Sequence, residues 1–356
     1  MIQRQLKLRL TSPQKSQLTD WLWHLTGVWN WAIRKLELDA RDRVYYTPKA
    51  FHNLLAGHSI KLGIPSHTLQ GTLTTAYTAR LRWRKKLAKR PKLKGQRNKL
   101  TSIPFPDPLK APVGNTIAVP GIGHVRFHKQ PLPEGRIKGA RLVKRASGWY
   151  LCLFIDAAPE AIPATGDAQA GIDPGFRHLL TLSSGEKIPH PRELEETARR
   201  LAQAQRGHRS QLAPRLQERL ANRRKDRNHK LSRQLVAAHA CLVWSKDRHQ
   251  AIARAFGKSV ASSGHAQLRS MLAYKCTASG RRFVEVPSKF STKTCSACGS
   301  LSGPTGYTGL SVRQWVCAVC GTAHDRDVNA AVNTLVAGVG TTHEGHPKVA
   351  SGIPWL

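Results

Sequence analysis

The sequence predicts a mixed α/β fold in two parts, an N-terminal module over residues 1–156 and a C-terminal domain that begins at residue 171. Three observations support this prediction. Residues 2–10 alternate apolar with polar side chains, as a half-buried strand does. Apolar residues then recur at helical spacing from Ser12 onward. Residues 157–170 are small and include prolines, which is typical of a linker between two domains.

The N-terminal module is expected to begin with the strand at residues 2–10 and a long helix. Ser12 is the candidate N-cap of this helix, and Pro13 would occupy its first position. The apolar residues at helical spacing are Leu18, Trp21, Leu22, Leu25, Val28, Trp29, Ala32 and Leu36. Trp29 and Trp31 could stack on nucleic-acid bases, but aromatic residues beside such a stripe favour a core position.

The remainder of this module alternates between helix and short strands. A second helix, increasingly basic toward its end, is predicted for residues 67–89. The chain is then rich in Pro and Gly, and its short β-prone segments are residues 115–120, 124–128, 139–143 and 149–156. This order indicates a β-barrel-like module with a helical insertion.

The C-terminal domain is predicted to open with a strand, a turn and a second strand over residues 171–188. The segments that follow are a helical region at 191–238, a strand at 240–244, a helix at 261–274, a strand at 281–286 and a final helix at 328–336. Residues 338–356 contain Gly and Pro throughout, so we expect a flexible tail there.

The charge of the chain points to a polyanionic partner. It contains 57 Lys and Arg against 21 Asp and Glu, a formal net charge of +36. Such an excess repels itself unless a polyanion neutralises it, so nucleic acid is the expected partner. A membrane is not expected, because no apolar run approaches the roughly 18–20 residues that a spanning helix needs. A hydrophobic content of 40% argues against a disordered basic chain.

Two basic runs are the candidate tracks for phosphate backbones. Residues 80–99 include 11 Lys or Arg, and residues 206–233 include ten. Either run alone could be a solvated surface, but two runs in so basic a chain favour nucleic-acid contacts. The candidate binding residues are Arg80, Arg82, Arg84, Lys85, Lys86, Lys89, Arg90, Arg223, Arg224, Lys225 and Arg227.

Two CxxC pairs, separated by 18 residues, predict a zinc ribbon over residues 295–321. The four candidate ligands are Cys295, Cys298, Cys317 and Cys320. Four thiolates complete a tetrahedral shell, so the zinc would be structural and without an open catalytic position. The other cysteines, Cys152, Cys241 and Cys276, are expected to be ordinary thiols. Paired cysteines in an odd total also favour a reducing compartment over a disulfide framework.

Three aspartates in this basic chain are candidates for a magnesium site. Asp173 lies in the segment GIDPG, near the start of the predicted strand-turn-strand unit, and Asp325 and Asp327 lie where the final helix begins. Carboxylates from a strand and a later helix can converge on Mg²⁺, which prefers oxygen ligands. Asp325 is expected to be the helix N-cap instead. Asp173 could equally be a turn residue, so the residues alone leave the metal site open.

Four segments, in this order, resemble the TnpB/OrfB proteins of bacterial insertion sequences, which are relatives of the type V CRISPR effector nucleases. The segments are GIDPG, KFSTKTCSACG, the second CxxCG and HDRDVNAAVNTL. The segments LRLTSPQKSQL, VWNWAIRKL, SRQLVAAHACLVW and LRSMLAYK are also similar to the family, more loosely. The resemblance therefore covers most of residues 1–337.

This resemblance implies an RNase H-like domain of the RuvC type, with its first part at 171–294 and its final helix at 322–337. The zinc ribbon at 295–321 would be inserted between them. It also implies that residues 1–156 form a wedge and recognition module that holds an RNA derived from the transposon end. Asp173 would match the first catalytic acid of the family and Asp327 the third. One or two Mg²⁺ ions would be the catalytic cofactor.

The second catalytic acid departs from the family pattern. The family has a glutamate at the end of an apolar strand, and here simple alignment puts Ser245 at that position. Asp247 keeps the same side-chain parity if the strand continues, so it is the provisional substitute. Glu285, on the strand before the ribbon, is a second possible substitute. The third alternative is that the site has lost a ligand.

The function implied by the resemblance is a transposon-associated RNA-guided DNA endonuclease that uses two-metal phosphodiester hydrolysis. Its partners would be a guide RNA from the transposon end and target DNA, without a membrane. A monomer or weak dimer in the bacterial cytoplasm, associated with the nucleoid, is expected. One alternative is an RNA-guided DNA-binding protein with lost or impaired cleavage. Another is an accessory transposase that acts in transposition and DNA recombination.

Overall fold

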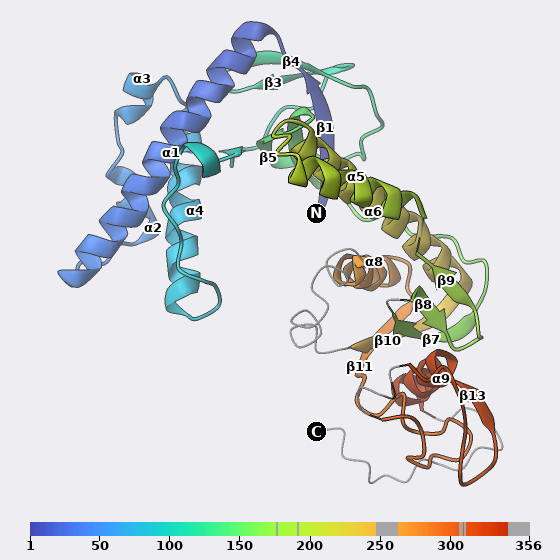
Figure 1. Cartoon of the computed structure of the whole chain (residues 1–356). Helices are drawn as coiled ribbons and strands as arrows, with labels where there is room; N and C mark the ends of the chain where they lie inside the picture. Colours follow the sequence, from blue (N-terminus) through green and yellow to red (C-terminus); the bar gives the residue numbers. More distant parts are fainter. Residues whose placement is uncertain (176, 191, 247–262, 306–308, 310, 341–356) are drawn as a thin grey trace. The chain divides into compact units, whose positions relative to one another are not determined.

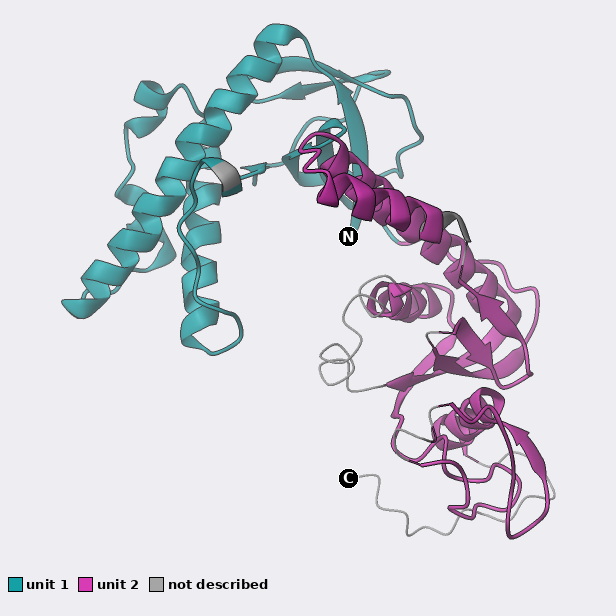
Figure 2. Cartoon of the chain, viewed as in Figure 1, with its two compact units in different colours: residues 1–158 teal, residues 159–356 magenta. Residues whose placement is uncertain are grey.

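The chain forms two compact units, residues 1–158 and residues 159–356, which Figure 2 distinguishes by colour. The structure is a computed structural model that describes residues 1–175, 177–190, 192–246, 263–305, 309 and 311–340. Both units combine helices with a β-sheet, so the mixed α/β class predicted from the sequence is confirmed.

Unit 1 consists of a six-stranded antiparallel sheet and four α-helices (Figure 1). The strands are β1 (Ile2–Arg9), β2 (Ser102–Phe105), β3 (Thr116–Val119), β4 (Gly123–Phe127), β5 (Arg136–Arg145) and β6 (Gly148–Asp156), in the order β2-β5-β6-β1-β4-β3. The helices are α1 (Ser12–Arg41), α2 (Pro48–Asn53), α3 (His58–Leu62) and α4 (Ser66–Arg84). The two short helices α2 and α3 were not expected from the sequence.

Helix α1 begins one residue earlier than the sequence suggested, because Thr11 and not Ser12 is its N-cap. The Thr11 hydroxyl accepts a hydrogen bond from the Gln14 amide at 3.4 Å, and the Gln14 side chain accepts one from the Thr11 amide at 3.1 Å. This reciprocal pair is a capping box, which satisfies two amides at the helix start. Trp29 is buried in the core of unit 1, as predicted, and Trp31 packs against it.

Helix α4 ends at Arg84, five residues earlier than predicted. Lys86 adopts a left-handed conformation with φ of 56°. The Leu87 amide donates to the Arg82 carbonyl at 2.9 Å, and the Lys86 amide donates to the Trp83 carbonyl at 2.9 Å. These two bonds form a Schellman motif, which usually has glycine at the left-handed position. Because a lysine occupies this position, the sequence gives no glycine signal that the helix ends there.

Unit 2 contains a five-stranded mixed sheet in the order β11-β10-β7-β8-β9. Its strands are β7 (Ala168–Pro174), β8 (His178–Leu182), β9 (Lys187–Pro189), β10 (His239–Lys246) and β11 (Arg282–Pro287). Its helices are α5 (Arg192–Arg206), α6 (Leu212–Ala238), α8 (His265–Ala278) and α9 (Arg326–Val339). A small hairpin of β12 (Gln314–Val316) and β13 (Ala323–Asp325) precedes α9. Strand β10 lies between β7 and β11 and is parallel to both.

Two predicted boundaries in unit 2 were wrong, and one predicted helical region contains a break. Strand β7 begins at Ala168, inside the predicted linker, because it pairs with β10 from that residue onward. The helical region predicted at 191–238 is divided into α5 and α6, and His208 between them has a φ of 50°. Helix α9 runs to Val339, into the predicted tail; residues 341–356 of that tail lie outside the described residues. None of the described helices is both long and apolar enough to cross a membrane.

The sheet of unit 2 is covered on both faces, with α8 and α9 on opposite sides (Figure 1). On one face, Leu242 and Trp244 of β10 join a core with Leu268 and Leu272 of α8. On the other face, Val243 joins a smaller cluster that includes residues of β11 and α9. Because side chains alternate along a strand, odd-numbered residues of β10 face α9 and even-numbered residues face α8.

The close packing of α9 on β7 depends on Gly171. A Cβ at this position would lie 2.0 Å from the Ala331 carbonyl oxygen and 2.6 Å from the Leu335 amide nitrogen. Both neighbours are backbone atoms of α9, so they cannot rotate away. We expect Gly171→Ala to destabilise unit 2 by about 1–3 kcal/mol or more through overpacking. Thermal or urea unfolding measures this change.

The matched control is Gly27→Ala in α1, where an added Cβ would meet no atom within 4 Å. A helix-interior alanine there should stabilise unit 1 by about 0.5–1 kcal/mol. An unfolding midpoint unchanged by Gly171→Ala would contradict the close approach of α9 to β7.

Candidate functional site

The first candidate site lies where parallel strands β7, β10 and β11 end. Parallel strands bring their carboxyl ends to one edge of a sheet, which is where open α/β sheets bind ligands. Asp173 is the penultimate residue of β7, and Ser245 is the penultimate residue of β10. Trp244 pairs with Ile172, so Ser245 lies at the level of Asp173 on the neighbouring strand.

Ser245 lies two residues after Val243 on β10, so both side chains project from the same face of the sheet. Val243 packs in the cluster that includes α9, and Ser245 therefore faces α9 as well. Its side chain is 0% exposed, and its hydroxyl has no hydrogen-bond partner within the described part of the chain. A buried hydroxyl without a partner costs free energy, and such an atom calls for a specific explanation. The structure therefore has an unpaired polar atom beside Asp173, at the position where the resemblance leads one to expect a glutamate.

The N-terminus of α9 lies at the same level of the sheet as Asp173. Asp173 pairs with Thr181 of β8, and Thr181 pairs with Lys187 of β9. Directly paired residues in an antiparallel sheet project to the same face. The Lys187 ammonium donates to the Asp325 carboxylate at 2.6 Å. This bond connects the paired residues Asp173, Thr181 and Lys187 to the start of α9. Asp173 therefore faces α9 at the end where Asp327 is found.

Asp325 is the N-cap of α9, as predicted from the sequence. Its Oδ1 accepts hydrogen bonds from the backbone amides of Asp327 and Val328, both at 3.1 Å. Burial by itself raises the pKa of Asp325. The hydrogen bond from Lys187 and the two helix amides outweigh burial, so the pKa lies below its usual value. Asp325 is thus an ionised residue with a structural role, and its two carboxylate oxygens are already bonded to Lys187 and to two helix amides.

Asp327 contacts a basic residue of the segment that precedes the β-hairpin. Its Oδ1 lies 3.6 Å from the Arg313 guanidinium, and both side chains are partly exposed. In the part of the chain that the structure describes, Asp173 and Asp327 do not belong to a cluster of three or more acidic or other metal-ligating groups. Among the described residues, this edge therefore offers Asp173 and Asp327 as the carboxylates that remain after Asp325 is used as the helix cap.

The two substitutes considered for the missing glutamate differ in their placement. Glu285 pairs with Trp244 and forms ion pairs with Lys246 at 3.1 Å and with Arg269 of α8 at 3.5 Å. It therefore projects from the α8 face, opposite to Asp173, and this geometry argues against a shared metal. Asp247 lies outside the described residues.

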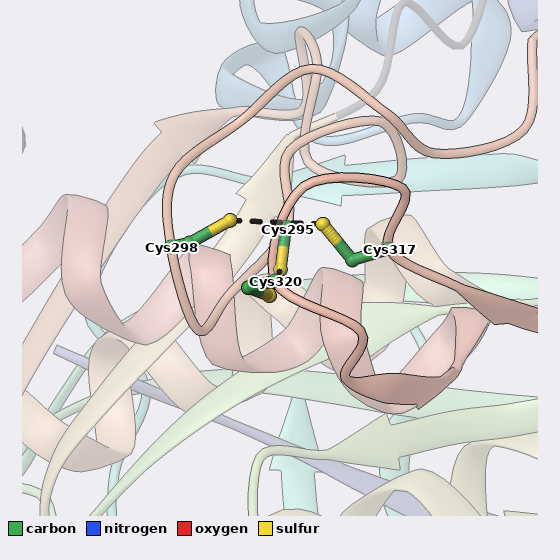
Figure 3. Close-up of side chains that lie close together, drawn as sticks. All are labelled: Cys295, Cys298, Cys317 and Cys320. Atoms are coloured by element: carbon green, nitrogen blue, oxygen red, sulfur yellow. Dashed lines mark hydrogen bonds between the residues drawn. The ribbon is translucent and has the colours of Figure 1, made fainter.

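The second candidate site is the cluster of four cysteines shown in Figure 3. The Sγ atoms of Cys295 and Cys320 are 3.7 Å apart, those of Cys298 and Cys317 are 3.6 Å apart, and all four lie within 4.8 Å of one another. A tetrahedral zinc with Zn–S bonds of about 2.3 Å would separate its sulfurs by about 3.8 Å. The cluster therefore has the dimensions needed to bind zinc.

The surroundings act differently on these sulfurs: burial raises the pKa of the Cys295 thiol, whereas nearby hydroxyl groups favour the charged form of Cys317. Hydroxyl groups of Ser300 and Ser302 lie 3.3 Å and 3.0 Å from the Cys317 sulfur, and they lower the pKa of that thiol to about 5. His324 Nε2 lies 3.0 Å from the Cys295 sulfur and can donate to it when that nitrogen carries the proton. Trp315 packs on the His324 ring with the centroids 4.6 Å apart. Sequence reasoning assigned no role to His324, although it follows closely after the second CxxCG.

Asparagine side chains of α9 hold the segment that leads into the cysteine cluster. Asn329 donates to the Thr294 carbonyl at 2.8 Å and accepts from the Ser296 amide at 2.9 Å. Asn333, one turn later, donates to the carbonyls of Ser291 and Thr294 at 2.8 Å and 2.7 Å. The helix that carries Asp327 therefore also fixes the cysteine cluster. The motif NAAVN contained this signal, because two asparagines four residues apart lie on one helix face.

The first basic run is partly built into unit 1. Arg82 and Arg84 are on α4, and Lys85, Lys86 and Lys89 follow it, all of them exposed. The Arg90 guanidinium lies 5.8 Å from the Trp83 ring centroid and forms an ion pair with Glu37.

The end of this basic run is tied to α1. The Asn30 amide donates to the Lys94 carbonyl at 2.7 Å, and the Trp29 indole donates to the Lys92 carbonyl at 3.2 Å. This end of the run is therefore an ordered surface.

The second basic run lies on α6, and its members differ in exposure. Lys225 is exposed, and Arg223 donates to the Thr197 hydroxyl of α5 at 3.0 Å. Arg227 is half-buried and donates to the Asn228 side chain and to the Ser263 carbonyl, both at 2.7 Å. Burial lowers the pKa of Arg227 to about 10. Arg227 therefore has a structural role in addition to any contact with a ligand.

Two family matches cover much of unit 2. Residues 155–246 match the OrfB_IS605 family, described as "Probable transposase". Residues 265–334 match the family described as "Cas12f1-like, TNB domain". The first match contains Asp173 and Ser245, and the second contains the cysteine cluster and Asp327.

Similar curated proteins come from several bacteria. A protein of Streptomyces pristinaespiralis named "Putative RNA-guided DNA endonuclease" is 37% identical over 228 residues, which are 59% of this chain and 55% of that protein. The match thus spans about half the length of that relative. The InsQ protein of Escherichia coli K12, with the same description, is 24% identical over 304 residues, 77% of this chain and 75% of that protein.

Among solved structures, a cryo-EM complex of Cas12f1 with single-guide RNA and target DNA matches at 15% identity and a TM-score of 0.39. The match covers 94% of this chain and 99% of that chain, and so low a likeness says nothing about the site. The two family matches and the curated relatives agree with the sequence motifs. The chain thus carries the OrfB_IS605 and Cas12f1-like TNB segments, and its resemblance to the TnpB/OrfB family is confirmed.

Proposed function

We propose that this protein is a transposon-associated, RNA-guided DNA endonuclease with a RuvC-type, Mg²⁺-dependent active site. The observation that supports it most is that Asp173 lies near the carboxyl ends of parallel strands, on the sheet face that α9 covers, and that Asp327 lies in the first turn of α9. A net charge of +36 supports a polyanionic substrate. The names of the curated relatives support guidance by RNA.

In this proposal Asp173 and Asp327 bind one or two Mg²⁺ ions through carboxylate oxygens. Such ions supply a water nucleophile of lowered pKa and stabilise the leaving oxygen of a phosphodiester. Asp173 is fixed by the pairing of β7 with β8, and Asp327 by the first turn of α9. Asp325 is assigned to capping only, because its oxygens are already bonded to Lys187 and two amides.

The remaining parts of the chain would hold nucleic acid and support the active site. We propose that residues 1–156 are the wedge and recognition module and that their basic run binds the guide RNA. Residues 171–294 with the helix of 322–337 would form the nuclease domain, and residues 295–321 a structural zinc ribbon. Asn329 and Asn333 support that zinc assignment, because they connect the ribbon to the helix that carries Asp327.

A second candidate function is RNA-guided DNA binding without cleavage. Ser245 is the observation that favours it, since a neutral hydroxyl is buried beside Asp173 where a third carboxylate would hold a metal. Two carboxylates bind Mg²⁺ more weakly than three, because less negative charge offsets the loss of water from the ion. Sequencing the RNA that copurifies with the protein from its native locus tests what the two functions share, namely a specific guide.

We predict one zinc ion per chain. Cys317→Ser should remove it and unfold the region around residues 295–321, because metal binding to such a site supplies folding free energy. Elemental analysis and thermal denaturation of the purified protein measure both effects. Cys276→Ala is the control: this thiol is buried in the core of unit 2, so stability should fall while one zinc per chain is retained. A wild-type protein that is folded and contains no metal would refute the assignment.

We predict salt-sensitive RNA binding through the first basic run. Replacing Lys85, Lys86 and Lys89 together with glutamate should lower the slope of log affinity against log salt by at least about 0.7 for each phosphate that these lysines bind. Filter binding across a salt series measures the slope. The control replaces Lys15, Lys49 and Lys110, which are also exposed, with glutamate and so changes the net charge equally. Equal slopes for the two triple variants would indicate a merely solvated surface.

We predict weak, Mg²⁺- or Mn²⁺-dependent cleavage of a DNA that matches the guide. Asp173→Ala should abolish it, whereas Asp156→Ala, which removes an exposed carboxylate paired with Lys138, should not. Ser245→Glu should increase cleavage, because it adds a carboxylate beside Asp173. If the wild-type protein binds guide and target without cleaving and Ser245→Glu creates activity, the natural protein is a guided binder.

A further inference from the structure

Unit 1 contains a small open cavity whose lining combines aromatic and basic side chains. It has a volume of about 220 Å³ and lies between the second half of α1, the turn that follows α1, and α4. The lining residues that matter here are Val44, Tyr45, Tyr46, Tyr77, Arg80 and Arg84, and the rest of the described lining is apolar. No acidic side chain is among these described lining residues, and the first basic run begins at Arg80.

The wall of this cavity is held in place by hydrogen bonds. The Tyr46 hydroxyl donates to the Asp39 carboxylate at 2.6 Å, and the Tyr77 hydroxyl donates to the Tyr46 carbonyl at 3.0 Å. The turn itself is tight: Arg43 has a left-handed φ of 60°, and the Val44 amide donates to the Asp39 carbonyl at 2.8 Å. These bonds use the polar groups of Tyr46 and Tyr77 and leave their rings as cavity wall.

The same turn presents apolar side chains to solvent at the rim of the cavity. Tyr45 is 62% exposed, Val44 is 46% exposed and Leu81 is 39% exposed. A cluster of exposed apolar side chains commonly marks a binding surface. Tyr45 is not part of the hydrophobic core of unit 1. The aromatic contacts of the core in this region are made by its neighbours Tyr46 and Phe51.

The cations at the cavity are arranged around aromatic rings. The Arg84 guanidinium lies 5.1 Å from the Tyr45 ring centroid. The Arg80 guanidinium, one turn earlier on α4, lies 4.8 Å from the Trp83 ring centroid. A planar guanidinium beside a tyrosine ring can share one stacked ligand, and it can also donate two hydrogen bonds to a phosphate. Aromatic and arginine side chains in a basic groove are the combination that binds unpaired nucleotides.

We propose that this cavity binds one unpaired nucleobase, stacked on Tyr45 beside Arg84, with an adjacent phosphate against Arg80. The inference rests on the proposed function only in requiring that the chain bind a polynucleotide. An apolar protein segment is the less favoured occupant, because the Arg84 guanidinium at the rim would then be desolvated without an anionic partner.

The size and chemistry of the cavity limit what it can select. Sites for drug-sized ligands occupy roughly 300–1,000 Å³, so a cavity of about 220 Å³ suits a single base rather than several. Ring faces and guanidinium groups do not distinguish one base from another, since every base has a π-face. The cavity should therefore recognise that a base is unpaired, whatever its identity.

The test uses the full-length protein and four fluorescein-labelled 12-nucleotide probes: single-stranded RNA, single-stranded DNA, a DNA duplex, and a single-stranded DNA of the same length without bases. Tyr45→Ala should weaken binding of a base-containing single strand by about 5- to 150-fold, the range for loss of one stacked base. Tyr45→Phe, which keeps the ring, should bind as the wild type does. The duplex and the base-free probe should be insensitive to both changes. A loss with RNA alone would identify the guide RNA as the source of the base, and a loss with DNA alone would identify a DNA strand.

Two arginines on α4 provide the matched charge control. Arg84→Gln and Arg82→Gln each remove one charge, but only Arg84 lines the cavity. The inference expects Arg84→Gln to weaken single-strand binding more than Arg82→Gln, and the difference to vanish on the base-free probe. Tight binding of single strands by Tyr45→Ala, equal to that of the wild type, would overturn the inference and leave the proposed function intact. A wild-type protein that binds none of the probes would instead overturn the proposed function.

Discussion

The contact between α9 and strand β7 is the constraint on which the rest of unit 2 depends. A side chain as small as a methyl group at Gly171 would overlap the α9 backbone, so the helix and strand can approach only because this residue is glycine. From that position, α9 projects Asp327 at its first turn and holds the segment before the cysteine cluster through Asn329 and Asn333. One helix thus couples the edge of the sheet to the cysteine cluster, and a shift in α9 would move both.

Among the described residues, the neighbourhood of Asp173 differs from what the proposed three-carboxylate site would require. Near the start of α9, Lys187 neutralises Asp325, two helix amides bind the same carboxylate, and Arg313 lies near Asp327. The neutral Ser245 lies beside Asp173 with its hydroxyl unpaired, at a cost of about 1–3 kcal/mol for such a group. In the proposed function, the affinity of this edge for a divalent cation is the property that would separate a nuclease from a guided binder.

Unit 1 uses its basic residues in two ways. Lys92 and Lys94 belong to a segment that α1 holds through Trp29 and Asn30, so part of the positive charge is fixed in position. Arg80 and Arg84 instead surround a cavity with an exposed tyrosine. Fixed charges on an ordered surface bind a phosphate backbone without first having to be ordered, which favours affinity. An aromatic residue beside them adds sensitivity to whether a base is paired.

The sequence by itself determined the mixed α/β class, the main strands and helices, the buried position of Trp29, the N-cap role of Asp325 and the four-cysteine cluster. These depend on local periodicity and on short spacings, which a chain carries in its residue order. The end of α4 near Lys86 was missed because a Schellman motif without glycine is a weak local signal. The start of α1 was missed although Thr11 and Gln14 have the spacing of a capping box, since Ser12 is also a favoured N-cap residue. Only the tertiary structure decided that Ser245 lies beside Asp173, that Glu285 faces α8, and that Tyr45 and Arg84 line one cavity. These relations depend on strand register and on the packing of segments distant in sequence, and the pattern of one segment does not encode where another will lie.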